Sequence, residues 1–286
     1  MTPFKEVEDA FRVAAGFDLR PHTVYACYVG SKAHGTHVPS DDPESIDDID
    51  ILAIVLPPPA AVLGLNPWKE SEHLQVGEWD LVVHSLAKFT RLLLKGNPNT
   101  LAALWVRPED QLFCSSVFRS SYLWEKRAFS AKAAHDSFAG YAKQQLQKMA
   151  ASENAYQGYM GEKRKKLVDR FGYDTKNAAH LIRLSLMGIE FLQTGEVTVY
   201  RTNDAELLRD IKQGKRSRAE VEELARHLSE EAVKALATSP LPDQPDAVAA
   251  ERLLMYFYAV EWGVKNPDPD YYDESWPRVE DQGIVE

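Results

Sequence analysis

The chain has 286 residues, of which 44% are hydrophobic and 27% charged, and its formal net charge is −10. This composition is that of a globular protein with length enough for one large domain or two small ones. The acidic balance argues against a general nucleic-acid coat protein, and no apolar run approaches the roughly 20 residues of a membrane span.

The first third of the chain alternates helix and strand patterns. An amphipathic opening over residues 4–14 predicts a helix, and the β-branched and aromatic run Val24–Val29 predicts a buried strand. A second strand is predicted over Ile49–Leu56, where three consecutive prolines end it. The alternation in Glu78–His84 predicts a third strand, and Ser85 predicts the N-cap of the helix that follows it.

Carboxylates at the head of the second strand are the first candidate for chemistry. Side chains two apart on a strand share a face, so Asp48 and Asp50 would point the same way, roughly 6 to 7 Å apart along the backbone. That spacing suits a pair of metal ions about 3.5–4 Å apart. If the third strand pairs beside the second, Asp80 completes a cluster of three carboxylates. Such oxygen ligands suit Mg²⁺ or Mn²⁺.

The turn after the first strand is the second candidate. Backbone N–H groups of Gly30 and Ser31, with the Ser31 hydroxyl, would cradle the β- and γ-phosphates of a nucleoside triphosphate. Lys32 is either a counter-charge for that triphosphate or an exposed loop lysine. His34 and His37 have no cysteine or glutamate partner at zinc-ligand spacing, and we expect them to be structural or to face phosphate.

Helix patterns dominate from about residue 130 onward. Helices are predicted over residues 132–160, 175–192, 203–212, 217–237 and 246–262. Asn203 followed by Glu206 predicts a capping-box start, and the proline-rich stretch 238–245 predicts a linker.

Three basic side chains stand at helical spacing in this second part. Lys176, His180 and Arg183 follow at steps of four and three, so they share one helix face. That face is either solvated or turned toward the active cleft, where it would contact a phosphate. Arg183 is the first to test, because a guanidinium binds phosphate bidentately. The basic segments 163–183 and 201–218 are compatible with a confined polyanion such as a nucleotide or an RNA end.

The cysteine content and the order of the elements complete the expectations. Cys27 and Cys114 are far apart in the sequence, which predicts reduced thiols in a cytoplasmic protein, with a single disulfide as the alternative. The N-terminus lacks the apolar region of a signal peptide. We expect an α+β fold: a small mixed β-sheet head with flanking helices at residues 1–125, an α-helical domain at 126–262, and an acidic irregular tail at 263–286.

These motifs resemble the nucleotidyltransferase superfamily of the DNA polymerase β type, whose signature is a Gly-Ser pair, Asp-x-Asp and a later Asp. The chain is similar to the branch called the RNA-repair-pathway DNA polymerase β family over roughly residues 23–215. The matching segments are Gly30–Thr36, the Asp80 strand, Asn97–Leu101, Leu104-Trp105, Tyr173–Lys176, His180–Arg183 and Leu192–Glu196.

Two positions depart from the family pattern. Asp47 stands where the family has Ser before Asp-x-Asp, and Ala102-Ala103 follow the Asn-Pro-Asn segment where we would expect Glu. Asp47 could therefore compete with Asp48 as a ligand. We prefer Asp48 and Asp50, because they share a strand face with a continuous apolar run behind them.

The resemblance implies metal-dependent transfer of a nucleoside monophosphate from an NTP to a hydroxyl, releasing pyrophosphate. The expected acceptor is an RNA 3′ end, with a protein hydroxyl or a small molecule as alternatives. In this reading Asp48, Asp50 and Asp80 hold two metal ions, Asp80 activates the hydroxyl, and Ser31 stabilises the pyrophosphate. The alternative is a non-catalytic nucleotide-sensing or partner-binding module on the same fold, such as half of a toxin–antitoxin pair.

Overall fold

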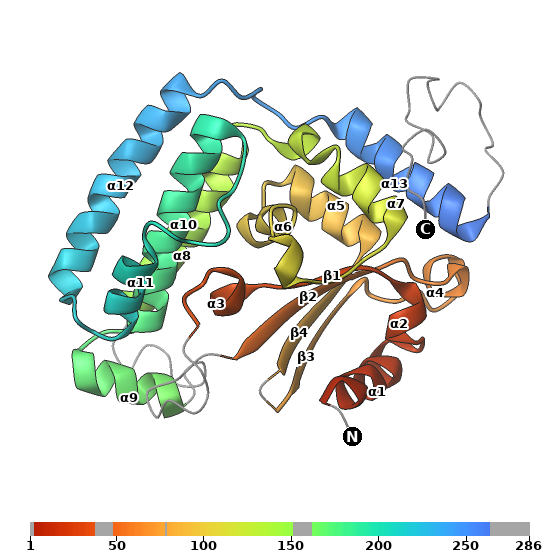
Figure 1. The fold of residues 1–286 in the computed structure, drawn as a ribbon, viewed down its shortest axis with the longest axis horizontal. Coiled ribbons are helices and arrows are strands. Elements are labelled where there is room, and N and C mark those ends of the chain that lie inside the picture. The colour runs from red at the N-terminus through yellow and green to blue at the C-terminus, as the bar shows by residue number, and fades with distance from the viewer. Residues whose placement is uncertain (1–2, 38–47, 78, 151–161, 264–286) are drawn as a thin grey trace.

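The computed structural model of this protein describes residues 3–37, 48–77, 79–150 and 162–263. Five strands form one mixed sheet with the order β3-β4-β2-β1-β5 (Figure 1). The strands are β1 (Thr23–Tyr28), β2 (Ile49–Val55), β3 (Ser71–Val76), β4 (Trp79–Ser85) and β5 (Gln111–Cys114). β2 and β4 are parallel, whereas the other neighbouring pairs are antiparallel. The small mixed sheet confirms the predicted α+β class.

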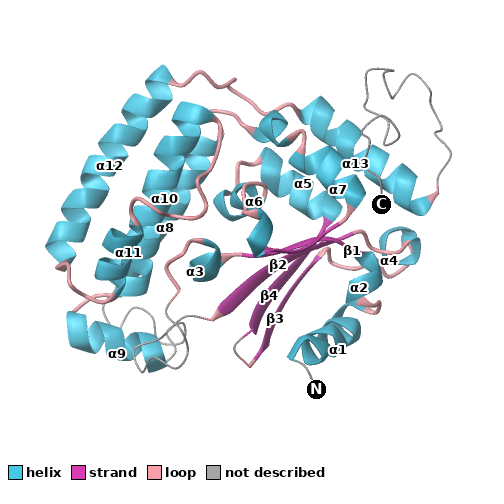
Figure 2. Cartoon of the chain, viewed as in Figure 1, coloured by secondary structure: helices cyan, strands magenta, loops and turns pink. Residues whose placement is uncertain are grey.

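Helices surround this sheet and also form a separate layer beside it (Figure 2). The helices of the first half are α1 (Pro3–Ala15), α2 (Leu19–His22), α3 (Gly30–Ala33), α4 (Pro59–Leu63), α5 (Leu86–Leu94), α6 (Pro98–Ala103) and α7 (Ser116–Phe118). Short helical turns lie between or after these helices at Pro108–Asp110, Arg119–Leu123 and Lys126–Phe129. The helices of the second half are α8 (Ala134–Ala150), α9 (Glu162–Phe171), α10 (Thr175–Thr194), α11 (Ala205–Lys212), α12 (Arg218–Thr238) and α13 (Ala247–Trp262).

Apolar side chains cover both faces of the sheet. On one face, Leu52 and Ile54 of β2 join the core that includes Phe89 of α5. On the other face, Ile51, Ala53 and Val55 of β2 pack with Phe11 of α1. Successive strand residues alternate between faces, so Asp50 shares the α5 side of the sheet with Leu52 and Ile54.

Helix α10 connects the helical layer to the sheet. Its residues Leu181 and Ile182 belong to a core with α8, α11 and α12, whereas Leu184 and Phe191 belong to the core above the sheet. Helix α13 returns to pack on α5, and its Phe257 is buried in that same core. The larger core thus contains residues from both predicted domains, and the boundary at residue 125 stays a prediction.

The three predicted strands are confirmed as β1, β2 and β4, but two others were missed. β3 carries the polar residues Glu72, His73 and Gln75, so its apolar alternation is weak. β5 has only four residues, and its apolar residues Leu112 and Phe113 are both exposed, so no buried and exposed alternation marks it as a strand. Both lie at sheet edges, where burial imposes little pattern.

Helix starts were predicted with mixed success. The Ser85 hydroxyl accepts a hydrogen bond of 2.9 Å from the Lys88 N–H, which confirms the N-cap of α5. The capping box predicted at Asn203 is wrong, because α11 begins after Asp204 and has no side-chain cap. The Asp204 carboxylate is instead bound by Arg201. Ser217 and Glu220 form a capping box at the start of α12.

The remaining expectations concern cysteines, membrane spans and the tail. Cys27 and Cys114 are both free, as the sequence predicted, so the disulfide alternative is not found. None of the helices in the described part of the chain is long and apolar enough to cross a membrane. The predicted tail, apart from Gly263, and the end of the helix predicted to residue 160 lie outside the described residues.

Candidate active site

The parallel pairing of β2 and β4 places two of the predicted carboxylates side by side. Asp50 lies opposite Asp80 in the register, and adjacent strands are about 4.8 Å apart. Both residues are half-buried and line a cavity of about 470 Å³, which we call the large cavity. Among its other lining residues are His34, His73, His84, Lys88, Asn99 and Tyr141.

The turn after β1 requires a glycine at its first position. Gly30 has φ +59°, and a Cβ at this residue would lie 1.9 Å from Oδ2 of Asp50. The missing side chain therefore lets the Asp50 carboxylate approach the backbone of the turn. The turn is closed by the Thr36 N–H, which donates to the Ser31 carbonyl at 3.0 Å. The Ser31 hydroxyl lies 3.2 Å from Nδ1 of His37.

A second cavity, of about 90 Å³, joins this turn to helix α10 and is called the small cavity here. Its lining residues are Gly30, Ser31, His34, Thr36, Asp50, Lys176, Ala179, His180, Arg183, Leu208 and Lys212. The helix face that carries Lys176, His180 and Arg183 is therefore turned toward the Gly-Ser turn. Asp50 and His34 line both cavities.

Two predicted site residues do not line either cavity. The Nζ of Lys32 lies 3.8 Å from the ring centroid of Tyr28, in a cation–π contact. Asp48 is half-buried directly before β2. Within the described residues, no group of three or more His, Cys, Asp or Glu side chains is arranged to hold a metal ion. The metal set Asp48, Asp50 and Asp80 therefore stays a prediction.

The two paired carboxylates have different neighbours. Asp50 lies against Gly30. It is also close enough to Arg183 to raise the pKa of that guanidinium. Oδ1 of Asp80 accepts a hydrogen bond of 2.5 Å from Nε2 of His73, which lies on β3. His73 was missed with its strand, and only the pairing of β3 with β4 brings it to Asp80.

Arg183 carries a positive charge beside the small cavity. Burial is the main cause that lowers its pKa, to about 9, and the nearby Arg201 lowers it further. Asp50 and Asp204 act in the opposite direction. A pKa of about 9 leaves the guanidinium protonated at neutral pH, so Arg183 can attract an anion in the cavity.

His34 is buried, with 4% of its surface exposed, and contacts both halves of the site. Its Nδ1 lies 2.8 Å from the Val199 carbonyl, and its Nε2 contacts Nη1 of Arg183. Since a carbonyl only accepts and a guanidinium only donates, Nδ1 carries the proton and Nε2 is the acceptor. Burial, followed by the charge of Arg183, holds the pKa of His34 well below its usual 6.5.

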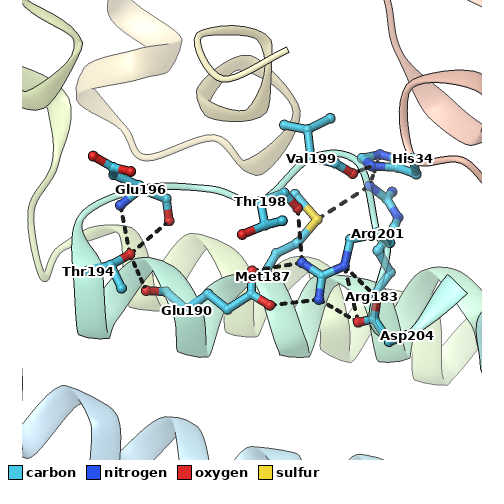
Figure 3. Close-up of polar contacts among 10 residues, drawn as sticks. All are labelled: His34, Arg183, Met187, Glu190, Thr194, Glu196, Thr198, Val199, Arg201 and Asp204. Carbon is cyan, nitrogen blue, oxygen red and sulfur yellow. Dashed lines mark hydrogen bonds and ion pairs between the residues drawn. The ribbon is translucent and has the colours of Figure 1, made fainter. Parts of the chain in front are cut away.

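The loop between α10 and α11 is held by the buried Arg201 (Figure 3). Its guanidinium donates to Glu190 at 2.7 Å from both Nη1 and Nη2, and its Nε donates to Asp204 at 2.9 Å. The Arg201 backbone N–H donates to the His34 carbonyl at 3.1 Å. The loop that carries Val199 and Arg201 is thus anchored to α10 and to the Gly-Ser turn.

We expect acid to destabilise the protein through His34. Because its pKa is lowered in the folded state, the unfolded chain binds a proton below pH 6.5 that the folded chain does not. This stability is complete above pH 6.5 and is progressively lost as the pH falls below 6.5. Urea unfolding between pH 7 and 5 measures the slope, which should be shallower in His34→Asn. Equal slopes in the two proteins would contradict the prediction.

We also expect Gly30→Ala to lower activity and stability together. The added methyl group would displace the Asp50 carboxylate from a distance of 1.9 Å, and the positive φ adds backbone strain. Gly16→Ala is the matched control, because Gly16 has φ +79° but nothing within 4 Å of its Cβ position. Activity and the temperature of thermal unfolding should both fall in Gly30→Ala, whereas Gly16→Ala should show only the strain effect on stability. Equal losses of activity would contradict the clash with Asp50.

The mixed sheet, the Gly-Ser turn and the paired aspartates define a head of the nucleotidyltransferase type. The family model described as RNA repair pathway DNA polymerase beta family matches residues 2–256, and the chain belongs to that family. No curated protein matches the sequence. A nucleotidyltransferase-like protein from Exiguobacterium sibiricum is 16% identical, with 89% of this chain and 80% of the other covered. The TM-score between the two structures is 0.27.

Proposed function

We propose that this protein transfers a nucleoside monophosphate from an NTP to a hydroxyl acceptor and releases pyrophosphate. The observation that carries the proposal is the small cavity, where Gly30 and Ser31 of the head meet Arg183 of helix α10. The two sides of this cavity are far apart in the sequence, as the contact between His34 and Arg183, 149 positions apart, illustrates. A Gly-Ser turn opposite a helix face that carries Lys176, His180 and Arg183 is suited to a polyphosphate.

The residues present are compatible with a divalent cation. Mg²⁺ is usually bound by one or two carboxylates together with substrate phosphates, so the paired Asp50 and Asp80 need no third protein ligand in the free protein. We propose that Asp50 and Asp80, with Asp48 beside them, hold Mg²⁺ or Mn²⁺ when the NTP is bound. The ion would polarise the α-phosphate and lower the pKa of the attacking hydroxyl.

In this proposal the small cavity holds the triphosphate and the large cavity holds the acceptor. Ser31 and the backbone of the turn would hold the triphosphate in the small cavity, and Arg183 would stabilise the negative charge that develops on the leaving pyrophosphate. The acceptor would enter the large cavity, with its hydroxyl beside Asp80, and this carboxylate would accept the proton. Asp50 lines both cavities, so the α-phosphate would react next to it.

An RNA 3′ end is the acceptor we propose. The family description names RNA repair, and the locally basic segments 163–183 and 201–218 suit a polyanion despite the overall charge of −10. An acceptor with a phosphate backbone also predicts binding that weakens as salt increases.

A labelling assay tests the function. The protein is incubated with each α-labelled NTP and a pool of short RNAs, first with Mn²⁺ and then with Mg²⁺. Label on the RNA supports the proposal, and label on the protein itself would point to a protein hydroxyl as acceptor. Tight NTP binding by calorimetry with no transfer to any acceptor would overturn the catalytic function in favour of nucleotide sensing.

A further inference from the structure

Two neighbouring arginines near the Gly-Ser turn have different hydrogen-bond partners (Figure 3). Arg201 is 3% exposed and bound by the carboxylates of Glu190 and Asp204, so its charge is neutralised where it stands. Arg183 lines the small cavity, and within the described residues its hydrogen bonds go to His34 and, at 3.6 Å, to Sδ of Met187. Neither partner is an anion.

A neutral partner has a specific consequence for a guanidinium. A carboxylate in the place of His34 would orient Arg183 but would also cancel much of its attraction for a phosphate. A neutral imidazole can fix the orientation through one hydrogen bond and leave the charge intact. The burial of His34 favours the neutral imidazole, because burial disfavours the charged form.

His34 is itself oriented from the opposite side. Its Nδ1–H donates to the Val199 carbonyl at 2.8 Å, and its own carbonyl accepts from the Arg201 N–H at 3.1 Å. Both contacts come from the loop that Arg201 ties to Glu190 on α10 (Figure 3). The chain of contacts therefore runs from this loop through His34 to the guanidinium of Arg183.

We propose that His34 is a positioning residue that holds the Arg183 guanidinium, with its charge intact, toward the small cavity. This inference rests on the proposed function, because it assigns the polyphosphate of a nucleoside triphosphate as the anion that Arg183 receives. His34 does not contact the reacting atoms in this scheme, and it acts through Arg183.

A double-mutant cycle tests this role by binding rather than by turnover. The probes are α,β-methylene analogues of the four NTPs, titrated by calorimetry in the presence of Mg²⁺. His34→Ala should weaken binding of the best analogue about tenfold in the wild-type background, which is the scale of one hydrogen bond to a charged group. In the Arg183→Ala background the same change should weaken it less than about twofold, since the residue through which His34 acts is gone.

Two conservative variants separate positioning from a purely structural role. His34→Asn keeps a donor near the position of Nδ1 for Val199 but loses the acceptor for Arg183. His34→Gln places an amide oxygen near the position of Nε2 and loses the Val199 contact. We expect His34→Asn to retain thermal stability and lose affinity, and His34→Gln to lose stability and retain affinity.

Arg209→Ala is the matched control for disturbance of the turn. Arg209 donates to the Gly35 carbonyl at 3.1 Å, next to His34, but it does not line the small cavity. It should leave the affinity for the analogue unchanged.

The outcomes distinguish this inference from the function on which it rests. Analogue binding with equal losses from His34→Ala in both backgrounds, or an Asn variant that binds as well as the wild type, would overturn the positioning role alone. If the wild-type protein binds none of the four analogues, the proposed function fails and this inference fails with it.

Discussion

Replacing Asp50 with asparagine is expected to lower the rate of nucleotide transfer about 10³-fold in a protein that still folds. Asparagine has nearly the same shape, so it fits against Gly30, where the carboxylate lies now. It removes the negative charge of Asp50, which lines both cavities, as does His34. A metal ion contributes several kcal/mol to the stabilisation of charge in the transition state. A 10³-fold loss of rate corresponds to about 4 kcal/mol, which is within that range.

The measurement is the rate of label transfer at saturating NTP, with thermal unfolding as the check on folding. Asp136→Asn is the control, because the Asp136 side chain is 95% exposed and it lines neither cavity. Asp80→Asn should cause a loss of similar size, and comparison of Asp47→Asn with Asp48→Asn shows which of the two adjacent aspartates contributes. An Asp50→Asn protein with more than a tenth of the wild-type rate would refute the catalytic role of Asp50.

Replacing Arg201 with methionine is expected to destabilise the protein by about 3–5 kcal/mol. The guanidinium satisfies two carboxylates, and its removal leaves Glu190 and Asp204 without the cation that both bind. Asp204 keeps only 14% of its side chain exposed, so water cannot replace the lost partner fully. The loop that holds His34 would lose its anchor to α10 as well.

Urea unfolding at neutral pH measures this loss. Arg226→Met is the matched control, because Arg226 also pairs with two glutamates, Glu223 and Glu230, but on the surface of α12. Surface ion pairs contribute little, so this variant should unfold at the wild-type urea concentration. Neutralising both acids in Arg201→Met with Glu190→Gln and Asp204→Asn should recover part of the stability. Equal losses of stability in the Arg201 and Arg226 variants would contradict the stabilising role of the buried Arg201.

The elements of the site that could be predicted are those with local signatures. A β-branched run that stops at Gly30 predicts a strand and a turn, and the aspartates at the head of β2 follow from period-two alternation. The helical spacing of Lys176, His180 and Arg183 predicts that they share one face. In each case the pattern depends on neighbours within a few residues, and the structure has the element where it was expected.

Other parts of the site have no local signature. β3 is a polar edge strand, so its contribution of His73 to Asp80 was not visible in the sequence. His34 was expected to be structural or to face phosphate, but its contact with Val199 could not be predicted, because the two residues are 165 positions apart. Lys212 lines the small cavity, because α11 packs beside α10.

The sequence by itself determined three strands and the turn of the head, most helices of the second part and the family to which the chain belongs. Only the tertiary structure decided that the basic face of α10 meets the Gly-Ser turn, that Asp50 and Asp80 are register partners, and that His34 lies between Arg183 and Val199. The reason is physical. Strand and helix patterns record which side of an element is buried, whereas the partner that buries it is set by packing between segments far apart in the chain.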